Sequence, residues 1–449
     1  MSELPEGWTP TPLGVLLKSI VGGGTPSKSN QAYFQGSIPF MTVKDLHARF
    51  VADTQDHISE EALEDSASTL IPADTLIVAT RMSLGKITRP LVPTAINQDL
   101  KALFLHDGID KTYVEYLWRA NEARIQGMGT GTTVKGIRLE DIRGLEVSLA
   151  SSAEQTRIAN QLDNLLTRVQ ACNNRIDAIP ALLKRFRQSV LRAAITGALT
   201  TACEWQLCKI KDAGKIQLGR QRAPKFHTGK NMRPYLRVQN VFENRLDLSD
   251  VMEMDFPGAD FDRYQLHPGD ILLNEGQSPE YLGRPAMYRG ELPGACFTNT
   301  LIRFQAYPHV NPEYALLVFR HHMHSGRYIV EGNITTNLAH LSAGRFSEVE
   351  FPLPTLEEQT EIVRRVEALF ALADRIETRC ATARAQAQRL SPLVLAKAFR
   401  GELVPQDPND EPANVLLARI GSSNTAVAGK NKQKVPVAQK KRGQAAINL

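Results

Sequence analysis

The sequence has few cysteines and no apolar segment of membrane-spanning length. Its 449 residues include five cysteines, an odd number scattered along the chain, so a disulfide framework is not expected and a reducing compartment is favoured. No apolar run approaches the roughly 20 residues that a transmembrane helix needs. Residues 1–11 also lack the basic and then apolar pattern of a secretory signal. We therefore expect a cytoplasmic protein with no membrane partner.

Motifs for catalysis and for metal binding are also missing. The chain has no Walker phosphate-binding loop. Asn311-Pro312-Glu313-Tyr314 differs at its third residue from the Asn-Pro-Pro-Tyr element of amino-methyltransferases, and no Gly-rich cofactor loop accompanies it. Asp270, Glu275 and Gln277 match part of a metal-dependent nuclease pattern, but the lysine of that pattern is absent. Cys203 and Cys208 have no second Cys/His pair at zinc spacing. His321, His322 and His324 cluster on a predicted helix, where an interface or surface role is favoured over metal binding. We expect no catalytic residue, no cofactor and no metal on this chain.

Size and charge leave binding functions open. A chain of 449 residues suits two to four domains, and 42% hydrophobic residues are enough for real cores. The formal net charge of +5 is mildly basic. Such a balance is compatible with nucleic acid as a partner but does not prove it.

A long segment of the chain occurs twice. Residues 154–199 align without a gap with residues 358–403, each matched pair 204 positions apart. Glu154-Gln155-Thr156 recurs at 358–360, and Gly197-Ala198-Leu199 corresponds to Gly401-Glu402-Leu403. An internal repeat of this kind determines the architecture, so it is the starting point for the fold.

Each copy has the pattern of one strand of a coiled coil. Apolar residues recur at alternating steps of four and three over several heptads, which indicates a helix–helix seam. The predicted seam residues are Ile158, Leu162, Leu165, Val169 and Ile176 in the first copy and Ile362, Val366, Leu369 and Ile376 in the second. We predict antiparallel helices, because a tandem repeat on one chain mimics a two-fold dimer. Pro180 and Pro392 lie inside the helices at non-equivalent places, so a kink or break is expected near each.

A globular unit precedes each helix, and the two units share weaker similarities. Pro39-Phe40-Met41-Thr42-Val43 corresponds to Pro234-Tyr235-Leu236-Arg237-Val238, for example. The predicted fold is α+β: two tandem α/β domains, each followed by a long helix, with the helices forming an antiparallel coiled coil of pseudo-two-fold symmetry. The predicted boundaries are 1–150 and 201–352 for the domains, 151–200 and 353–404 for the helices, and 405–449 for the tail.

The tail is Pro/Asp-rich at first, and residues 415–420 favour one short helix. From Gly421 onward it is Ser/Ala/Gly-rich and then basic, which predicts a mostly disordered basic tail.

Both domains carry basic and amide side chains near predicted strand ends or loops. Arg, Asn and Gln can pair with base edges, and Lys and Arg hold phosphates. The candidates are Lys44, Arg81, Lys86 and Lys135 in the first domain and Arg220, Arg222, Arg237, Gln239, Asn240, Asn274, Arg284 and Asn337 in the second. Each of them, taken singly, also fits a solvated surface residue.

The chain resembles the specificity (S) subunits of Type I restriction-modification systems over about residues 5–420. The repeated helices carry the more specific part of the resemblance, at 153–158, 352–359, 182–191, 197–199 and 401–403. Segments 80–85, 96–99, 274–278 and 283–284 are similar to parts of the recognition domains of that family. One departure is Ser148-Leu149-Ala150-Ser151, where a Pro-rich stretch is usual, so the start of the first helix is left open.

The resemblance implies a non-catalytic recognition subunit. Each domain would read one half of a bipartite site in double-stranded DNA, and the paired helices would set the half-site spacing and dock two methyltransferase (M) subunits. Those subunits bring S-adenosylmethionine and methylate adenine, and restriction (R) subunits with ATP and Mg join for cleavage. The alternative is a cytosolic coiled-coil scaffold that binds only proteins. A steep fall of DNA binding with salt would distinguish the first function from the second.

Overall fold

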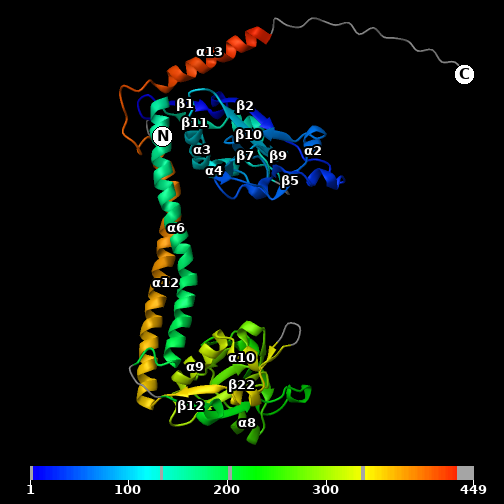
Figure 1. Ribbon diagram of the computed structural model, residues 1–449, viewed down its shortest axis with the longest axis vertical. Helices are drawn as coiled ribbons and strands as arrows, with labels where there is room; N and C mark the ends of the chain where they lie inside the picture. Colours follow the sequence, from blue (N-terminus) through cyan, green and yellow to red (C-terminus); the bar gives the residue numbers. More distant parts are fainter. Residues whose placement is uncertain (1–3, 132–134, 201–204, 335–338, 432–449) are drawn as a thin grey trace, which may run out of the picture. The chain divides into compact units, whose positions relative to one another are not determined.

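The computed structural model describes residues 4–131, 135–200, 205–334 and 339–431 (Figure 1). The chain divides into two compact units. Unit 1 comprises Met1–Asn174 and Arg384–Leu449, and unit 2 comprises Arg175–Ala383. Each unit therefore contains one globular domain together with parts of both long helices.

The domain of unit 1 is built on two main sheets whose strands interleave along the chain. One sheet has the strand order β2 (Leu17–Gly22), β10 (Leu100–Leu105), β7 (Leu76–Ala79), β8 (Ile87–Pro90), β4 (Phe50–Val51). The other has the order β5 (Asp56–Ile58), β3 (Ile38–Met41), β9 (Thr94–Ile96), β6 (Thr69–Ile71). A separate antiparallel pair joins β1 (Thr9–Pro12) to β11 (Glu146–Leu149). The helices are α1 (Leu13–Leu16), η1 (Gln31–Phe34), η2 (Val43–Asp45), α2 (Glu60–Glu64), α3 (Lys111–Ala120), α4 (Glu122–Met128) and α5 (Leu139–Arg143).

The domain of unit 2 repeats this plan. Its main sheet has the order β13 (Gly214–Leu218), β22 (Leu301–Ala306), β18 (Ile271–Asn274), β20 (Pro285–Met287). A second sheet has the order β17 (Met252–Asp255), β14 (Met232–Leu236), β21 (Cys296–Phe297), and a third has β19 (Gly276–Gln277), β24 (Ala339–His340), β23 (Asn333–Ile334). The remaining pairs are β12 (Gln206–Lys209) with β25 (Glu350–Leu353) and β15 (Val241–Phe242) with β16 (Arg245–Leu246). The helices are α7 (Ile210–Ala213), η3 (Pro224–Phe226), η4 (Val238–Asn240), α8 (Ala259–Tyr264), η5 (Pro279–Tyr281), α9 (Pro312–His324), α10 (Arg327–Glu331) and α11 (Ala343–Ser347).

In each domain one capped helix forms the centre of the core. Asp110 caps α3 by accepting a hydrogen bond from the Tyr113 backbone N–H, and Asn311 caps α9 by accepting one from Glu313. Such caps satisfy backbone donors that the first turn leaves free. Trp118 of α3 is buried, and its indole N–H donates to the Gly85 carbonyl, 2.9 Å away. The helix is thereby fixed against the turn between β7 and β8.

The long helices α6 (Ser152–Ile195) and α12 (Leu356–Ala398) pack side by side (Figure 1). In unit 1 the core contains Ile158 and Leu162 from the start of α6 and Leu395 and Ala398 from the end of α12. Within unit 2, Arg187 lies 2.6 Å from Asp374, and the Leu199 carbonyl, further along the chain, accepts a hydrogen bond from Arg365. As the residue number rises from 187 to 199, the number of the residue contacted in α12 falls from 374 to 365. The helices are therefore antiparallel, which confirms that prediction.

The predicted seam residues differ in how far they are covered. Ile158, Leu162, Ile362 and Val366 are buried, Leu165, Val169, Ile176 and Leu369 are half-buried, and Ile376 is 37% exposed. The buried positions are those where a globular domain also packs on the helix pair. Two helices alone cannot enclose a seam fully, which explains the gradient.

Neither long helix is interrupted at its proline. α6 continues through Pro180 and α12 through Pro392, so a break is wrong at both places, and a kink near either proline stays a prediction. A proline removes one backbone donor and leaves one carbonyl of the preceding turn without its partner. Both prolines lie on exposed faces, where water can satisfy that carbonyl.

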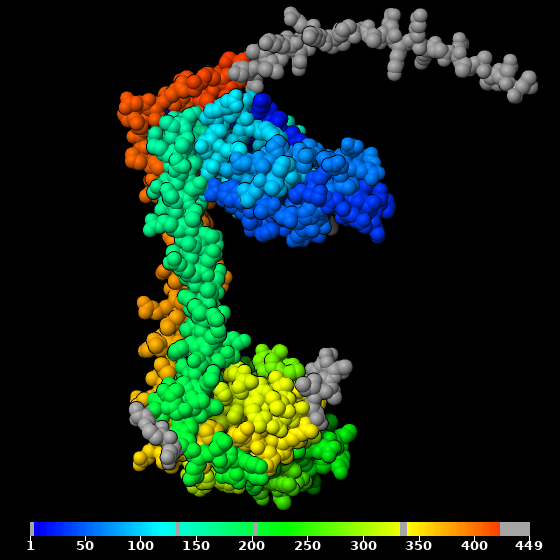
Figure 2. Space-filling model, in the orientation of Figure 1, coloured from blue at the N-terminus to red at the C-terminus, as the bar shows by residue number. Residues whose placement is uncertain are grey.

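The C-terminal segment is part of unit 1. Its helix α13 (Ala413–Asn431) extends well beyond the short helix expected at 415–420. Ala413, Leu416 and Ile420 are buried in the core of unit 1, and the Ala413 N–H donates to the Gly7 carbonyl. The space-filling view shows this orange-red segment directly against the start of α6 (Figure 2). Residues 421–431, assigned to a disordered tail, are helical, and the rest of that predicted tail (432–449) lies outside the described residues.

Candidate nucleic-acid interface

In unit 1 several strand ends meet at one edge of the domain. β3 and β9 are parallel, with Phe40 beside Ala95 and Met41 beside Ile96, so their carboxyl ends lie together. The chain leaving β9 stays attached there, because the Asn97 N–H donates to the Met41 carbonyl at 3.2 Å.

Two further backbone hydrogen bonds extend this edge to the β7 turn. The Thr80 N–H donates to the Asp99 carbonyl at 2.8 Å, and the Ile137 N–H donates to the Thr80 carbonyl at 2.9 Å. We call the surface formed by Lys44 and residues 81–86, 97–99 and 135–138 the unit 1 edge.

The same chain of backbone hydrogen bonds occurs in unit 2. β14 and β21 are parallel, and the Thr298 N–H donates to the Leu236 carbonyl at 3.1 Å. The Glu275 N–H then donates to the Thr300 carbonyl at 3.0 Å, and the Leu341 N–H donates to the Glu275 carbonyl at 2.8 Å. The unit 2 edge comprises residues 237–240, 274–284, 298–300 and 339–341. Thr80 and Glu275 therefore occupy equivalent positions.

Cationic side chains predicted to bind DNA lie on the unit 1 edge. Arg81 is 59% exposed and lies 3.8 Å from Asp99, which orients the guanidinium without covering it. Lys44 and Lys135 are exposed, and Lys86 lies 3.2 Å from Glu122. A hollow of about 450 Å³ opens here, lined by Arg81, Met82, Gln98, Asp99, Thr130, Gly136, Ile137 and Arg138.

The unit 2 edge combines amide, carboxylate and guanidinium groups. Arg237 and Gln239 both hydrogen-bond to the same oxygen of Asp250, at 2.7 and 2.6 Å. Arg284 lies over the rings of Phe242 and Tyr281, 4.6 and 5.3 Å from their centroids. Burial lowers the pKa of Arg284, and no ion pair is found for it among the described residues. A guanidinium that is held on aromatic faces and has no ion pair among the described residues can pair with an anionic ligand.

Two of the predicted contacts are buried within the domain of unit 2. Arg220 is 7% exposed, because its guanidinium lies 2.9 Å from Asp260 and donates to the Asp255 carbonyl. Asn240 is 1% exposed; it accepts a hydrogen bond from the Arg237 backbone and donates to two carbonyls. The polar groups of both residues are satisfied internally, so a DNA contact by either would require these bonds to break, and it stays a prediction.

The remaining predicted contacts have varied positions. Arg222 is exposed, with its guanidinium 5.7 Å from the centroid of the Tyr235 ring. Asn274 is fully buried, and neither polar atom of its side chain has a hydrogen-bond partner among the described residues. Asn337 lies outside the described residues.

Sequence reasoning missed several edge residues, among them Met82, Gln98, Arg138, Gln277 and Tyr281. Met82, Gln98 and Gln277 lie in segments that resemble the recognition domains of a known family, but residue type alone does not place any of the three at a surface. The backbone of Met82 has φ +60°, a value that is rare for residues other than glycine.

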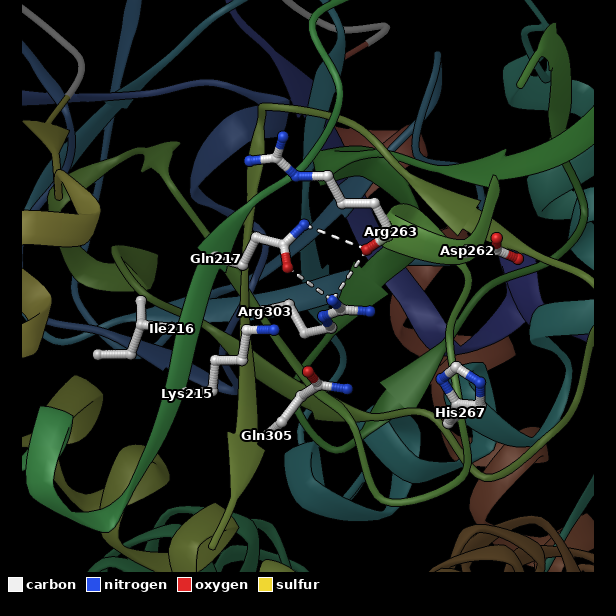
Figure 3. Close-up of a pocket in the computed structure, with 8 residues that line it drawn as sticks. All are labelled: Lys215, Ile216, Gln217, Asp262, Arg263, His267, Arg303 and Gln305. Carbon is white, nitrogen blue, oxygen red and sulfur yellow. Dashed lines mark hydrogen bonds between the residues drawn. The ribbon is translucent and has the colours of Figure 1, made fainter. Parts of the chain in front are cut away.

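A further hollow in unit 2, of about 350 Å³, lies away from the predicted contacts (Figure 3). Arg303 in it is 4% exposed and donates to Gln217 at 2.8 Å and to the Arg263 carbonyl at 3.1 Å. Asp270 lies 3.4 Å from the same guanidinium. The group ties β13 and β22 to α8, which is a structural role.

Each domain is fixed to the helix that follows it by matching contacts. The indole N–H of Trp8 donates to Glu154 at 2.8 Å in unit 1, and that of Trp205 donates to Glu358 at 3.0 Å in unit 2. The neighbouring glutamines, Gln155 and Gln359, accept hydrogen bonds from the backbone N–H at the caps of α3 and α9. The contacts fix the direction of each domain relative to its own helix.

Within the described ranges, no group of three or more His, Cys, Asp or Glu side chains could hold a metal ion. No helix among those residues is long and apolar enough to cross a membrane.

Comparison with known proteins identifies the family. Residues 5–181 and 203–382 match the Type I restriction modification DNA specificity domain. The chain is 27% identical to the Type I restriction enzyme StySPI specificity subunit of Salmonella potsdam and 28% identical to the EcoDI specificity subunit of Escherichia coli, in both cases over 95% of this chain and 98% of the relative.

Among solved structures, the fold is similar to that of the HsdS subunit from Thermoanaerobacter tengcongensis, with a TM-score of 0.59, 16% identity and coverage of 89% of this chain and 98% of that one. It is also similar to a chain from work on complex assembly and conformational transition of the type I R-M system, with a TM-score of 0.64, 15% identity and coverage of 90% and 100%. The matched domain occurs twice and covers most of the sequence, and the chain belongs to the family of Type I restriction-modification specificity proteins.

Proposed function

We propose that this chain is the DNA sequence-specificity subunit of a Type I restriction-modification complex, and that each domain reads one half of a bipartite site in double-stranded DNA. The observation that carries the proposal is the chain of backbone hydrogen bonds that occurs in both units, from Met41 to Ile137 and from Leu236 to Leu341. The residues that make these bonds have different side chains in the two units. Two equivalent edges with different polar groups suit two half-sites of different sequence.

The chemistry of the edges suits DNA. Exposed Arg81 and half-buried Arg284 can contact guanine or phosphate, Gln239 can contact adenine, and Lys44 and Lys135 can contact phosphates. The glutamine is held by Asp250 in the free protein. DNA has to compete with that carboxylate, which favours a partner that offers two hydrogen bonds at once.

We assign the chemical step to partner subunits. The paired helices would dock two methyltransferase subunits, which bind S-adenosylmethionine, and would set the spacing of the half-sites. Restriction subunits with ATP and Mg would join the same assembly. The similarity to named specificity subunits over nearly the full length supports this division of labour.

The test is a methylome. The chain is expressed with its methyltransferase subunits in a host that lacks the system, and methylated adenines are mapped across the genome. A bipartite motif with a fixed spacer is expected. Exchange of residues 203–352 for those of a relative should change one half of the motif and leave the other half and the spacer unchanged.

A salt titration separates this function from a scaffold that binds only proteins. Because phosphate contacts release counterions, DNA affinity should fall steeply and linearly on a log–log plot against salt concentration. Absence of DNA binding at every salt concentration would favour the scaffold.

A further inference from the structure

One apolar side chain on the unit 1 edge is held in solvent by a strained backbone. Met82 is 62% exposed, more than any other large hydrophobic side chain among the described residues of 4–150. It stands between Arg81 and the rest of the β7–β8 turn, on the rim of the 450 Å³ hollow.

The backbone at this residue has an uncommon geometry. Met82 has φ +60°, and the Ser83 N–H donates to the Arg81 carbonyl at 2.7 Å, so the three residues form a γ-turn with positive φ at its centre. Turns of this kind are rare and strained.

The surroundings stabilise this conformation. The Met82 N–H donates to the Lys135 carbonyl at 3.1 Å, and the Thr80 N–H and carbonyl are both bonded to other segments of the edge. Strain that is maintained in this way at an exposed site is a recognised sign of a functional residue. The strain here has one evident result, which is that a flexible apolar side chain faces solvent among polar groups.

We propose that Met82 is a specificity-determining residue that makes an apolar contact with a thymine methyl group in the half-site read by unit 1, an inference that rests on the proposed function. The major groove presents one apolar group, the thymine C5-methyl, and the remaining base-edge groups there are hydrogen-bond donors or acceptors. Arg81, next in the chain and 59% exposed, is placed to contact a neighbouring guanine or phosphate.

The equivalent position in unit 2 supports a reading role. Met82 lies two residues after Thr80, and Gln277 lies two residues after Glu275, the counterpart of Thr80. The Met82 N–H donates to the Lys135 carbonyl, and Gln277 pairs with Ala339 of β24, which occupies the corresponding place in unit 2. The two units thus present an apolar side chain and an amide at one equivalent place, as two different half-sites require.

The test uses the assembled complex with its methyltransferase subunits and duplexes that carry its mapped site. Each thymine of the half-site read by unit 1 is replaced in turn by uracil, which removes only the methyl group. At one position the wild type should lose about fourfold in affinity, the value expected for one buried methyl group. Met82→Ala should bind more weakly overall and should show no further loss with uracil at that position.

Two control variants separate contact from folding. Leu91→Ala removes another exposed apolar side chain (54%), at the far end of β8, and should bind every duplex as the wild type does. Met82→Gly relieves the positive φ, so it should raise the thermal unfolding temperature while losing the same discrimination as Met82→Ala.

The outcomes identify which idea fails. If the wild type binds its bipartite site but uracil has equal effects on the wild type and on Met82→Ala at every thymine, or if that half-site holds no thymine, the role of Met82 is refuted and the proposed function stands. If the wild-type complex recognises no bipartite site, the proposed function is refuted and the role of Met82 with it.

Discussion

Trp8→Phe tests the attachment of the first domain to α6. Trp8 is 7% exposed, and its indole N–H donates to Glu154, which is itself 2% exposed. Phenylalanine keeps most of the apolar contact but removes the donor. The other Glu154 oxygen retains Gln406 at 2.6 Å, so one of two hydrogen bonds to a buried carboxylate is lost. A hydrogen bond to a charged group contributes about 1.5–3 kcal/mol, so the expected loss is about 2 kcal/mol.

Unit 2 provides the matched variant, Trp205→Phe. Trp205 and Glu358 are both half-buried, and Glu358 retains the hydroxyl of Thr200 at 2.6 Å. Water can replace the lost donor at this more open site. The expected loss is therefore smaller, about 1 kcal/mol or less.

Hydrogen exchange measures both effects locally, because it reports the opening free energy of each segment. Trp8→Phe should speed exchange in β1 by about thirtyfold, since each 1.4 kcal/mol corresponds to a factor of ten. Trp205→Phe should speed exchange in β12 by less than tenfold and leave β1 unchanged. Equal effects of the two variants, or acceleration throughout the chain, would refute this account of the attachment.

Three further predictions concern spacing, pH and the C-terminal helix. Deleting one heptad from the middle of both α6 and α12 keeps the seam in register and shortens each helix by about 10 Å. Methylome mapping should then show a spacer between the half-sites that is shorter by about three base pairs. An unchanged spacer would contradict the proposed role of the helices in setting that spacing. Burial would raise the pKa of Glu243, but the hydrogen bond from His324 and the charge of Arg320 outweigh it and lower the pKa from 4.5 to about 2. Stability from this group is therefore present above pH 4.5 and lost as the pH falls toward 2, and acid titration of unit 2 unfolding should become flatter in Glu243→Gln. Leu416→Ala, at a site 5% exposed, should destabilise unit 1 by about 2–3 kcal/mol in denaturant unfolding, whereas Val415→Ala, 40% exposed, should change it by less than about 0.5 kcal/mol.

The long helices could be predicted from the sequence because their signal is local. Heptad spacing and a gapless repeat predicted helices over 154–199 and 358–403, and the structure has them over Ser152–Ile195 and Leu356–Ala398. A glycine at the same place in both copies explains why the two helices end at equivalent positions. Gly197 and Gly401 have φ +76° and +74°, the left-handed conformation that ends helices and favours glycine.

The candidate site was less predictable because it depends on partners distant in sequence. Arg81 and Arg220 are the same residue type near strand ends, yet Asp260, forty positions further on, keeps Arg220 inside the fold. α13 was underestimated for the same reason. Its burial depends on contacts with Gly7 and with the core of the first domain, which no local pattern near residue 413 reveals.

The two edges can differ in chemistry because their framework is made of backbone groups. The bonds that start at the N–H of Thr80 and Ile137, and at that of Glu275 and Leu341, use only peptide donors and acceptors. Every residue except proline supplies both groups, so side chains on this framework can change without the loss of a framework bond. The attachments to the helices are different, because they need the indole and carboxylate groups themselves. This difference explains why the helix segments of the repeat match so closely while the domains have diverged, and it predicts that new recognition sequences arise by side-chain replacement on an unchanged edge.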